Sequence, residues 1–144
     1  MIILDTAVIL ETRQREPDPN VIAFLDNLDP TTTYTTAITV TEIMRGIGLL
    51  PSGNHRKELE NTASTLFQEA FAGRILPFNV EAARYFAIDA VRNDHPNLTV
   101  SFAVRVVAAI AKSNNGATIA TRDASELEAL GASVVSPWSP YRKP

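Results

Sequence analysis

Three acidic residues stand where apolar segments of the 144-residue chain give way to polar ones. Asp5 follows the apolar run at 2–4, Glu42 opens a helix expected after a threonine-rich stretch, and Asp123 ends the segment TRD. A buried carboxylate is costly unless it is paired or bound to a metal. Mg²⁺ and Mn²⁺ prefer oxygen ligands, and a carboxylate-held ion beside water can serve phosphodiester hydrolysis. The three acids are therefore candidate metal ligands.

Each of these acids also has a purely structural explanation. Asp5 could cap a short helix that follows it, and Glu42 has the capping-box spacing with Thr39. Asp123 and Glu126 show a similar spacing, with aspartate in place of Ser or Thr. Taken singly, capping is the favoured explanation of each acid. The two roles are compatible, because a capping carboxylate can present its second oxygen to a metal.

The pattern of apolar residues determines where these acids would lie. Short apolar or β-branched segments predict strands at 2–5, 31–36, 75–76, 117–120 and 133–135. Helical spacing predicts helices at 7–12, 21–28, 39–50, 55–72, 79–94, 100–115 and 123–130. Strands alternating with helices favour a parallel sheet covered by helices, whose sites form beyond the carboxyl ends of the strands. In such a sheet the three acids converge on one crevice.

Composition narrows the class of protein. The length predicts one domain over residues 1–144, and 45% apolar with 20% charged residues is typical of a globular protein. The lack of cysteine excludes disulfides and cysteine-ligated metal centres, and two histidines disfavour a histidine-rich zinc site. With no long apolar run and no secretory signal pattern, we expect a cytoplasmic protein without a membrane segment. A net charge of −3 means that nucleic-acid binding would need a local basic patch.

Six segments together carry a family resemblance. They are MIILDT (1–6), TTAITVTEIMRGI (35–47), GRILPF (73–78), AAIAKS (108–113), ATIATRD (117–123) and SPW (136–138). In this order the chain resembles the PIN-domain ribonucleases, specifically the VapC/FitB-like toxins of type II toxin–antitoxin pairs. Each segment is weak alone, but the ordered set spans nearly the whole chain. The resemblance implies a PIN-like three-layer α/β sandwich with a central, mainly parallel sheet flanked by helices.

The resemblance also implies an activity and its site. It implies an endoribonuclease that depends on Mg²⁺ or Mn²⁺, with family acids falling on Asp5, Glu42 and Asp123. Thr6 matches the polar residue after the first acid, and Thr121 belongs to the Thr-Arg-Asp motif. The implied partners are an RNA substrate, a VapB-like antitoxin and a second copy of the chain in a homodimer.

Two positions depart from the family pattern. A remaining family acid falls four residues before the AAIA segment, where this chain has Val104, and the family asparagine after the first acid is Ala7. Losing a carboxylate removes a charge and two donor oxygens, so metal affinity should fall. Val104 also fits the apolar stripe of its helix. Among nearby acids, Asp94 lies too far upstream, and Glu126 is the remaining candidate for a supporting ligand.

Three arginines close to the acids in sequence are candidate contacts for RNA phosphates: Arg13, Arg45 and Arg122. Arg13 and Arg45 could equally form ordinary solvated faces or bind a partner. Two functions follow. The first is a metal-dependent endoribonuclease toxin silenced by an antitoxin. The second is a catalytically impaired PIN-like module that acts by binding an antitoxin, its dimer mate or RNA.

Overall fold

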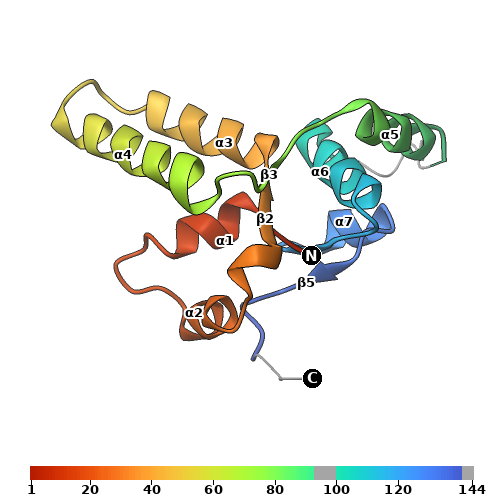
Figure 1. The fold of residues 1–144 in the computed structure, drawn as a ribbon, viewed down its shortest axis with the longest axis horizontal. Helices are drawn as coiled ribbons and strands as arrows, with labels where there is room; N and C mark the ends of the chain where they lie inside the picture. The colour runs from red at the N-terminus through yellow and green to blue at the C-terminus, as the bar shows by residue number, and fades with distance from the viewer. Residues whose placement is uncertain (93–99, 141–144) are drawn as a thin grey trace.

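Strands and helices alternate along the chain in the computed structural model, which describes residues 1–92 and 100–140 (Figure 1). The strands are β1 (Ile2–Leu4), β2 (Thr33–Thr36), β3 (Ile75–Leu76), β4 (Thr118–Ala120) and β5 (Val134–Val135). The helices are α1 (Thr6–Glu11), α2 (Pro19–Asp26), α3 (Ala37–Gly48), α4 (Asn54–Thr65), α5 (Val80–Arg92), α6 (Phe102–Ser113) and α7 (Ser125–Ala129). A 3₁₀ turn at Pro30–Thr32 precedes β2, and a π-helical turn at Leu66–Ala70 extends α4. Within the described ranges, every helix is too short or too polar to cross a membrane.

The five strands form one sheet in the order β3-β2-β1-β4-β5, and every neighbouring pair is parallel. The central strand β1 places Ile3 between Tyr34 of β2 and Ile119 of β4. Because all five strands run the same way, their carboxyl ends share one edge of the sheet. The prediction of a parallel sheet is therefore confirmed, and so is the position of each strand to within two residues.

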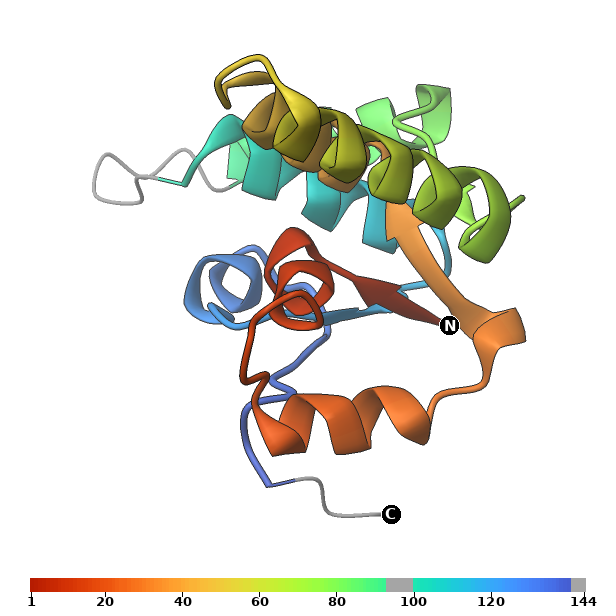
Figure 2. The same cartoon turned by 90° about the vertical axis from the view of Figure 1, so that its left-hand side faces the viewer.

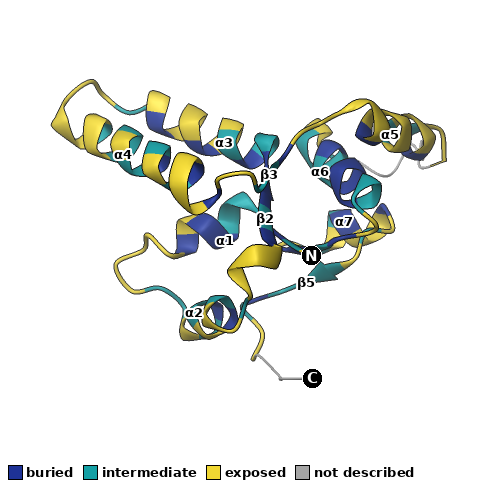
Figure 3. Ribbon diagram, viewed as in Figure 1, coloured by how far each residue is buried: buried dark blue, intermediate teal, exposed yellow. Residues whose placement is uncertain are grey.

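Neighbouring residues of β1 face opposite sides of the sheet and belong to different apolar clusters. Ile3 packs with residues of α5, α6 and α7, whereas Leu4 packs with residues of α1 to α4. Figure 2 shows α2 and α6 on opposite sides of the strands. Burial is concentrated on the strands and on α6, while α5 exposes most of its surface (Figure 3). The fold class is the expected three-layer α/β sandwich.

The start of α3 differs from the prediction. Thr36 caps this helix, because its hydroxyl accepts a hydrogen bond from the Thr39 amide at 3.2 Å, and the helix begins at Ala37. Glu42 therefore lies in the second helical turn, so the capping box expected between Thr39 and Glu42 is wrong. The prediction chose the wrong threonine as the cap, because several threonines follow one another here. The strand β2 ends at Thr36, and this residue caps α3.

Two other helix boundaries bear on the site. The helix α7 begins at Ser125 without a side-chain cap, so the expected cap of Asp123 with Glu126 is also wrong. Asn79 accepts a hydrogen bond from the Ala82 amide at 2.9 Å, which confirms the expected start of α5. Asp94, where that helix was expected to end, lies outside the described residues. In α6 the amide of Val104 donates to the hydroxyl of the cap Ser101, and the helix begins at Phe102, two residues after its expected start.

Candidate active site

A pocket of about 220 Å³ opens beyond the carboxyl ends of β1 and β4. Every acid singled out from the described part of the sequence lines this pocket, although the acids come from four separate segments. The full lining is Asp5, Thr6, Thr39, Glu42, Ala103, Val104, Val107, Thr121, Asp123, Glu126 and Leu127. The parallel sheet thus brings the predicted residues to one place.

Asp5 combines a capping role with a position in the pocket. Its carboxylate accepts a hydrogen bond from the Val8 amide at 3.0 Å and so caps α1. Its own amide donates to the Ala120 carbonyl at 3.1 Å, which fastens the end of β1 to β4. Burial raises the pKa of the Asp5 carboxyl above its usual value, against hydrogen bonds from the Thr121 side chain and two backbone amides, and nearby Glu42 raises it further. A bound cation would relieve this cost of charging Asp5.

Glu42 reaches the pocket from α3 and is held there by α1. The Thr6 hydroxyl donates a hydrogen bond to Glu42 Oε2, which joins two helices 36 residues apart in sequence. Thr39 lies one helical turn before Glu42 and lines the same pocket, so the i, i+3 spacing that suggested a cap instead marks a shared helix face. The Thr6–Glu42 contact fixes one carboxylate oxygen and leaves the other open.

The loop after β4 supplies the third acid. Thr121 is buried, and its amide donates to the Val135 carbonyl at 3.0 Å. Asp123 is exposed, and its Oδ1 accepts from the Ser125 hydroxyl at 2.9 Å. Glu126 follows on α7 and is half-buried at the pocket wall. The loop and α7 together add two carboxylates to the pocket that Asp5 lines.

An apolar wall replaces the family acid on the α6 side of the pocket. Ala103, Val104 and Val107 all line it. Val104 is half-buried, and its amide donates to the Ser101 hydroxyl at 3.2 Å. Val104 lies in the first turn of α6 and lines the pocket there.

The donor set is entirely oxygen, which fits a hard divalent cation such as Mg²⁺ or Mn²⁺. Within residues 1–92 and 100–140, however, no three acidic or histidine side chains stand close enough to hold one ion directly. Mg²⁺ usually retains several waters and needs only one or two protein carboxylates. The pocket therefore fits a largely hydrated cation.

The arginines are divided between two environments. Arg122 was expected to contact RNA phosphates, but its Nη2 lies 2.7 Å from Glu11 Oε2 and its guanidinium carbon lies 4.3 Å from the centre of the Trp138 ring. These two contacts hold the Arg122 guanidinium against the protein, while 58% of the side chain stays exposed. Arg13 and Arg45 are exposed, and neither has an ion-pair partner in the described part of the chain.

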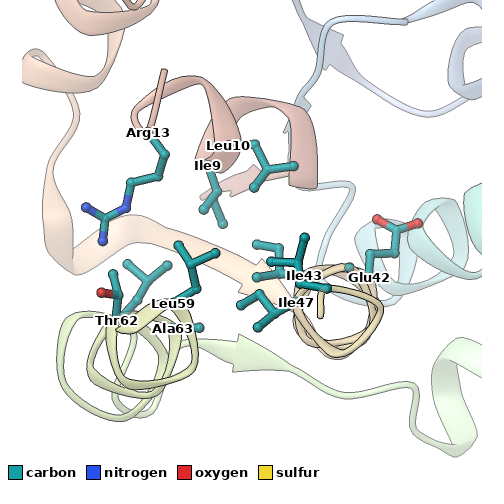
Figure 4. Close-up of a pocket in the computed structure, with 12 residues that line it drawn as sticks. Ile9, Leu10, Arg13, Glu42, Ile43, Ile47, Leu59, Thr62 and Ala63 are labelled. Carbon is teal, nitrogen blue, oxygen red and sulfur yellow. The ribbon is translucent and has the colours of Figure 1, made fainter. Parts of the chain in front are cut away.

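A second depression adjoins the acidic pocket. It is an apolar groove of about 320 Å³ between α1, α3 and α4, with Ile9 on one side and Ile43 on the other. Figure 4 shows Arg13 at one end of the groove and Glu42 at the opposite end. Glu42 also lines the acidic pocket, so this residue is shared by the two depressions.

Comparison with known proteins identifies the family: the chain belongs to the PIN domain family, whose model matches residues 2–131. A relative from Sinorhizobium fredii, VapC ribonuclease Y4jK, is 37% identical over 140 residues, covering 97% of this chain and 99% of that protein. Toxin FitB of Neisseria gonorrhoeae is 37% identical over 139 residues, covering 96% and 99%. The structure of FitAB bound to an IR36 DNA fragment matches with a TM-score of 0.90 and 34% identity over 99% of both chains.

Proposed function

We propose that this protein is a metal-dependent endoribonuclease, the toxin of a toxin–antitoxin pair, that hydrolyses RNA phosphodiester bonds. The observation that carries the proposal is the pocket in which Asp5, Glu42, Asp123 and Glu126 meet beyond the ends of two parallel strands. The kinship with a VapC ribonuclease and a FitB toxin supports the same activity and the same substrate class.

Asp5, Glu42 and Asp123 would hold the cation partly through its bound waters, with Glu126 in support. Bound Mg²⁺ or Mn²⁺ would supply a Lewis acid and an activated water for attack on phosphorus. Thr6 orients Glu42 through the hydrogen bond between their side chains, and Thr121 orients Asp5 in the same way. The apolar α6 wall excludes water from one side of the pocket, which strengthens the attraction between the acids and a cation.

RNA would approach along the exposed surface beside this pocket. The net charge of −3 gives no overall attraction for phosphate, so binding must rest on local cations. Arg13 and Arg45 are the candidates, because both are exposed; Arg13 lies in the turn after α1, and Arg45 lies on α3, the helix that carries Glu42. Each phosphate contact of this kind adds to the salt dependence of binding.

A VapB-like antitoxin would dock in the apolar groove between α1, α3 and α4. The groove shares Glu42 with the acidic pocket, so a chain lying in the groove would contact one of the acids and obstruct access to it. We also expect a homodimer. Exposed apolar side chains on α5 and at the start of α6 offer a surface for it, namely Val80, Tyr85, Ile88, Val91 and Phe102.

One observation favours a second candidate, a binding module with impaired catalysis. Val104 stands where the family has an acid, and three acids close enough to hold one ion directly are absent from the described residues. In that case the groove and the exposed arginines would still bind an antitoxin or RNA, without cleavage.

The test is RNA cleavage by the purified protein with Mg²⁺ or Mn²⁺ and with EDTA. We expect metal-dependent cleavage that falls on the order of a hundredfold in Asp5→Asn and in Asp123→Asn. Glu81→Gln is the matched control, because Glu81 is an exposed acid on α5 outside the pocket. Cleavage that persists in EDTA, or in both Asn variants, would contradict the proposal. RNA binding without cleavage would favour the second candidate.

A further inference from the structure

Consecutive residues in the loop after β4 have different surroundings. Thr121 and Asp123 line the acidic pocket, whereas Arg122 between them contacts Glu11 and Trp138, neither of which lines it. Rotating this loop to free Arg122 would therefore also move the two pocket residues. The partners of Arg122 determine how the loop presents Asp123.

Glu11 is a firm anchor for the Arg122 guanidinium. Glu11 is only 8% exposed and is the last residue of α1, the helix that Asp5 caps and Thr6 begins. Its Oε1 accepts from the Asp18 amide at 2.9 Å, and its Oε2 lies 2.7 Å from Arg122 Nη2. Because both carboxylate oxygens are engaged, Glu11 has a fixed position against which Arg122 is held.

Trp138 completes the contact from the C-terminal segment. The Arg122 guanidinium carbon is 4.3 Å from the centre of its ring, a distance typical of cation–π stacking. The buried indole nitrogen has no hydrogen-bond acceptor within residues 1–92 and 100–140. The Trp138 ring is therefore held by the Arg122 stack and by apolar packing. It packs against the apolar cluster that contains Leu4 and Val8.

We propose that Arg122 is a positioning residue: through Glu11 and Trp138 it fixes the loop that carries Thr121 and Asp123 into the acidic pocket. The catalytic consequence rests on the proposed function, but the positioning does not. Groups that orient metal ligands without touching the metal typically contribute ten- to a hundredfold to metal affinity or activity. Arginine suits this task better than lysine, because its flat guanidinium can pair with a carboxylate and stack on an aromatic ring together.

The test compares the full chain with Arg122→Met, Arg122→Lys and Glu11→Gln. Arg56→Met is the matched control, because Arg56 pairs with Glu60 at 2.8 Å on α4, away from the pocket. Amide hydrogen exchange of residues 121–125 is measured in EDTA, and Mn²⁺ affinity is measured by calorimetry. We expect Arg122→Met and Glu11→Gln to exchange faster in this loop and to bind Mn²⁺ roughly tenfold more weakly. Arg122→Lys should have an exchange rate and a Mn²⁺ affinity between those of these two variants and those of the parent. Arg56→Met should match the parent in both measurements.

Kinetics on RNA separate this role from a phosphate contact. A positioning residue should lower kcat and leave KM and its salt dependence unchanged, in Glu11→Gln as in Arg122→Met. If Arg122 instead binds phosphate, Arg122→Met should raise KM and reduce the salt dependence, while Glu11→Gln should not impair binding. That result, or unchanged loop exchange in both variants, would overturn the proposal. If the parent neither binds Mn²⁺ nor cleaves RNA, the proposed function fails, and the exchange comparison alone decides whether Arg122 positions the loop.

Discussion

At the scale of single residues, the structure both uses the Asp5 carboxylate and disfavours its charge. Its carboxylate caps α1, yet burial and the nearby Glu42 both work against its charge and raise its pKa. A folded state that holds this proton more tightly than the unfolded chain loses stability as the pH rises through the raised pKa. In the absence of metal, ionised Asp5 therefore destabilises the protein at neutral pH.

We predict that Asp5→Asn raises the melting temperature of the metal-free protein at pH 7, because the amide keeps the acceptor for the Val8 N–H without the charge. The gain should shrink as the pH falls toward 4, where the parent carboxyl becomes protonated. Thermal unfolding in EDTA between pH 4 and pH 8 measures this. Asp29→Asn is the control, and it should lower the melting temperature at pH 7. Hydrogen bonds from Thr31 lower the pKa of Asp29, so the charge of this carboxylate favours the folded state. A parent more stable than Asp5→Asn at pH 7 would refute the prediction.

The substituted position Val104 gives a second prediction. Val104 is the third residue of α6, where a negative charge is favourable by about 0.3–1 kcal/mol. Because its side chain is only half-buried, Val104→Asp should lose less than the roughly 1.5–3 kcal/mol of a fully buried valine. The variant should therefore fold, and it should gain more from added Mg²⁺ than the parent does.

Melting temperature against Mg²⁺ concentration, and Mn²⁺ calorimetry, measure this gain. Val104→Asn is the matched control, since it has the same shape without the charge. If folded Val104→Asp bound Mn²⁺ no better than Val104→Asn, the missing family acid would not explain the site. Glu126, which lines the same pocket, would then be the ligand to examine next.

The residues of the site were largely predictable, and the exceptions have a physical cause. Asp5 and Asp123 were predicted because each follows a strand, and Glu42 was predicted from an expected helix start although it lies in the second turn of α3. The partner of Arg122 was not found, because Glu11 lies 111 residues away and no local pattern links them. Contacts of this kind depend on how the elements pack.

At the scale of elements, one buried ion pair ties three helices together. Lys112 in the last turn of α6 lies 2.5 Å from Asp89 of α5, and its ammonium also donates to the Leu130 carbonyl after α7 at 2.6 Å. The two side chains are only 19% and 13% exposed. Since α7 carries Glu126, this contact also supports the wall of the acidic pocket.

We predict that Lys112→Met destabilises the protein by about 3 kcal/mol, because it leaves a nearly buried carboxylate and a carbonyl without their donor. Urea unfolding measures the loss, and Lys57→Met on the exposed face of α4 is the control. The double variant Lys112→Met with Asp89→Leu should recover part of the lost free energy of unfolding, since removing both charges is less costly than removing one. An unchanged free energy of unfolding in Lys112→Met would show that the pair contributes little.

The strands and helices were predictable from the local sequence wherever its patterns pointed to the same element. Within residues 1–92 and 100–140, short β-branched or apolar runs predicted each strand, and apolar spacing predicted each α-helix. The errors lie at helix starts, where more than one residue could cap. Thr36 and Thr39 both suited the start of α3, and only the end of the strand before them determines that Thr36 is the cap.

At the scale of the whole molecule, the parallel sheet explains both depressions. It aligns the strand ends that form the acidic pocket, and it sets α1 beside α3 so that their apolar faces leave a groove. The alternation of strands and helices was sufficient to predict the pocket. The groove was not predicted, because its shape depends on the distance between α4 and α1, which periodicity does not determine.

The groove also offers a test of partner binding that spares the acids. Gly46 of α3 lines the groove, and a side chain at this position would enter open space, because nothing lies within 4 Å of a Cβ built there. We predict that Gly46→Phe fills the groove, leaves the melting temperature and RNA cleavage close to those of the parent, and weakens antitoxin binding at least tenfold. Gly48→Phe is the matched control, since Gly48 lies on the same helix with equal space but does not line the groove. Calorimetry with the cognate antitoxin measures both variants. Equal affinities for Gly46→Phe and Gly48→Phe would mean that the antitoxin docks elsewhere, and the position of Glu42 at the end of the groove would then have no part in silencing the toxin.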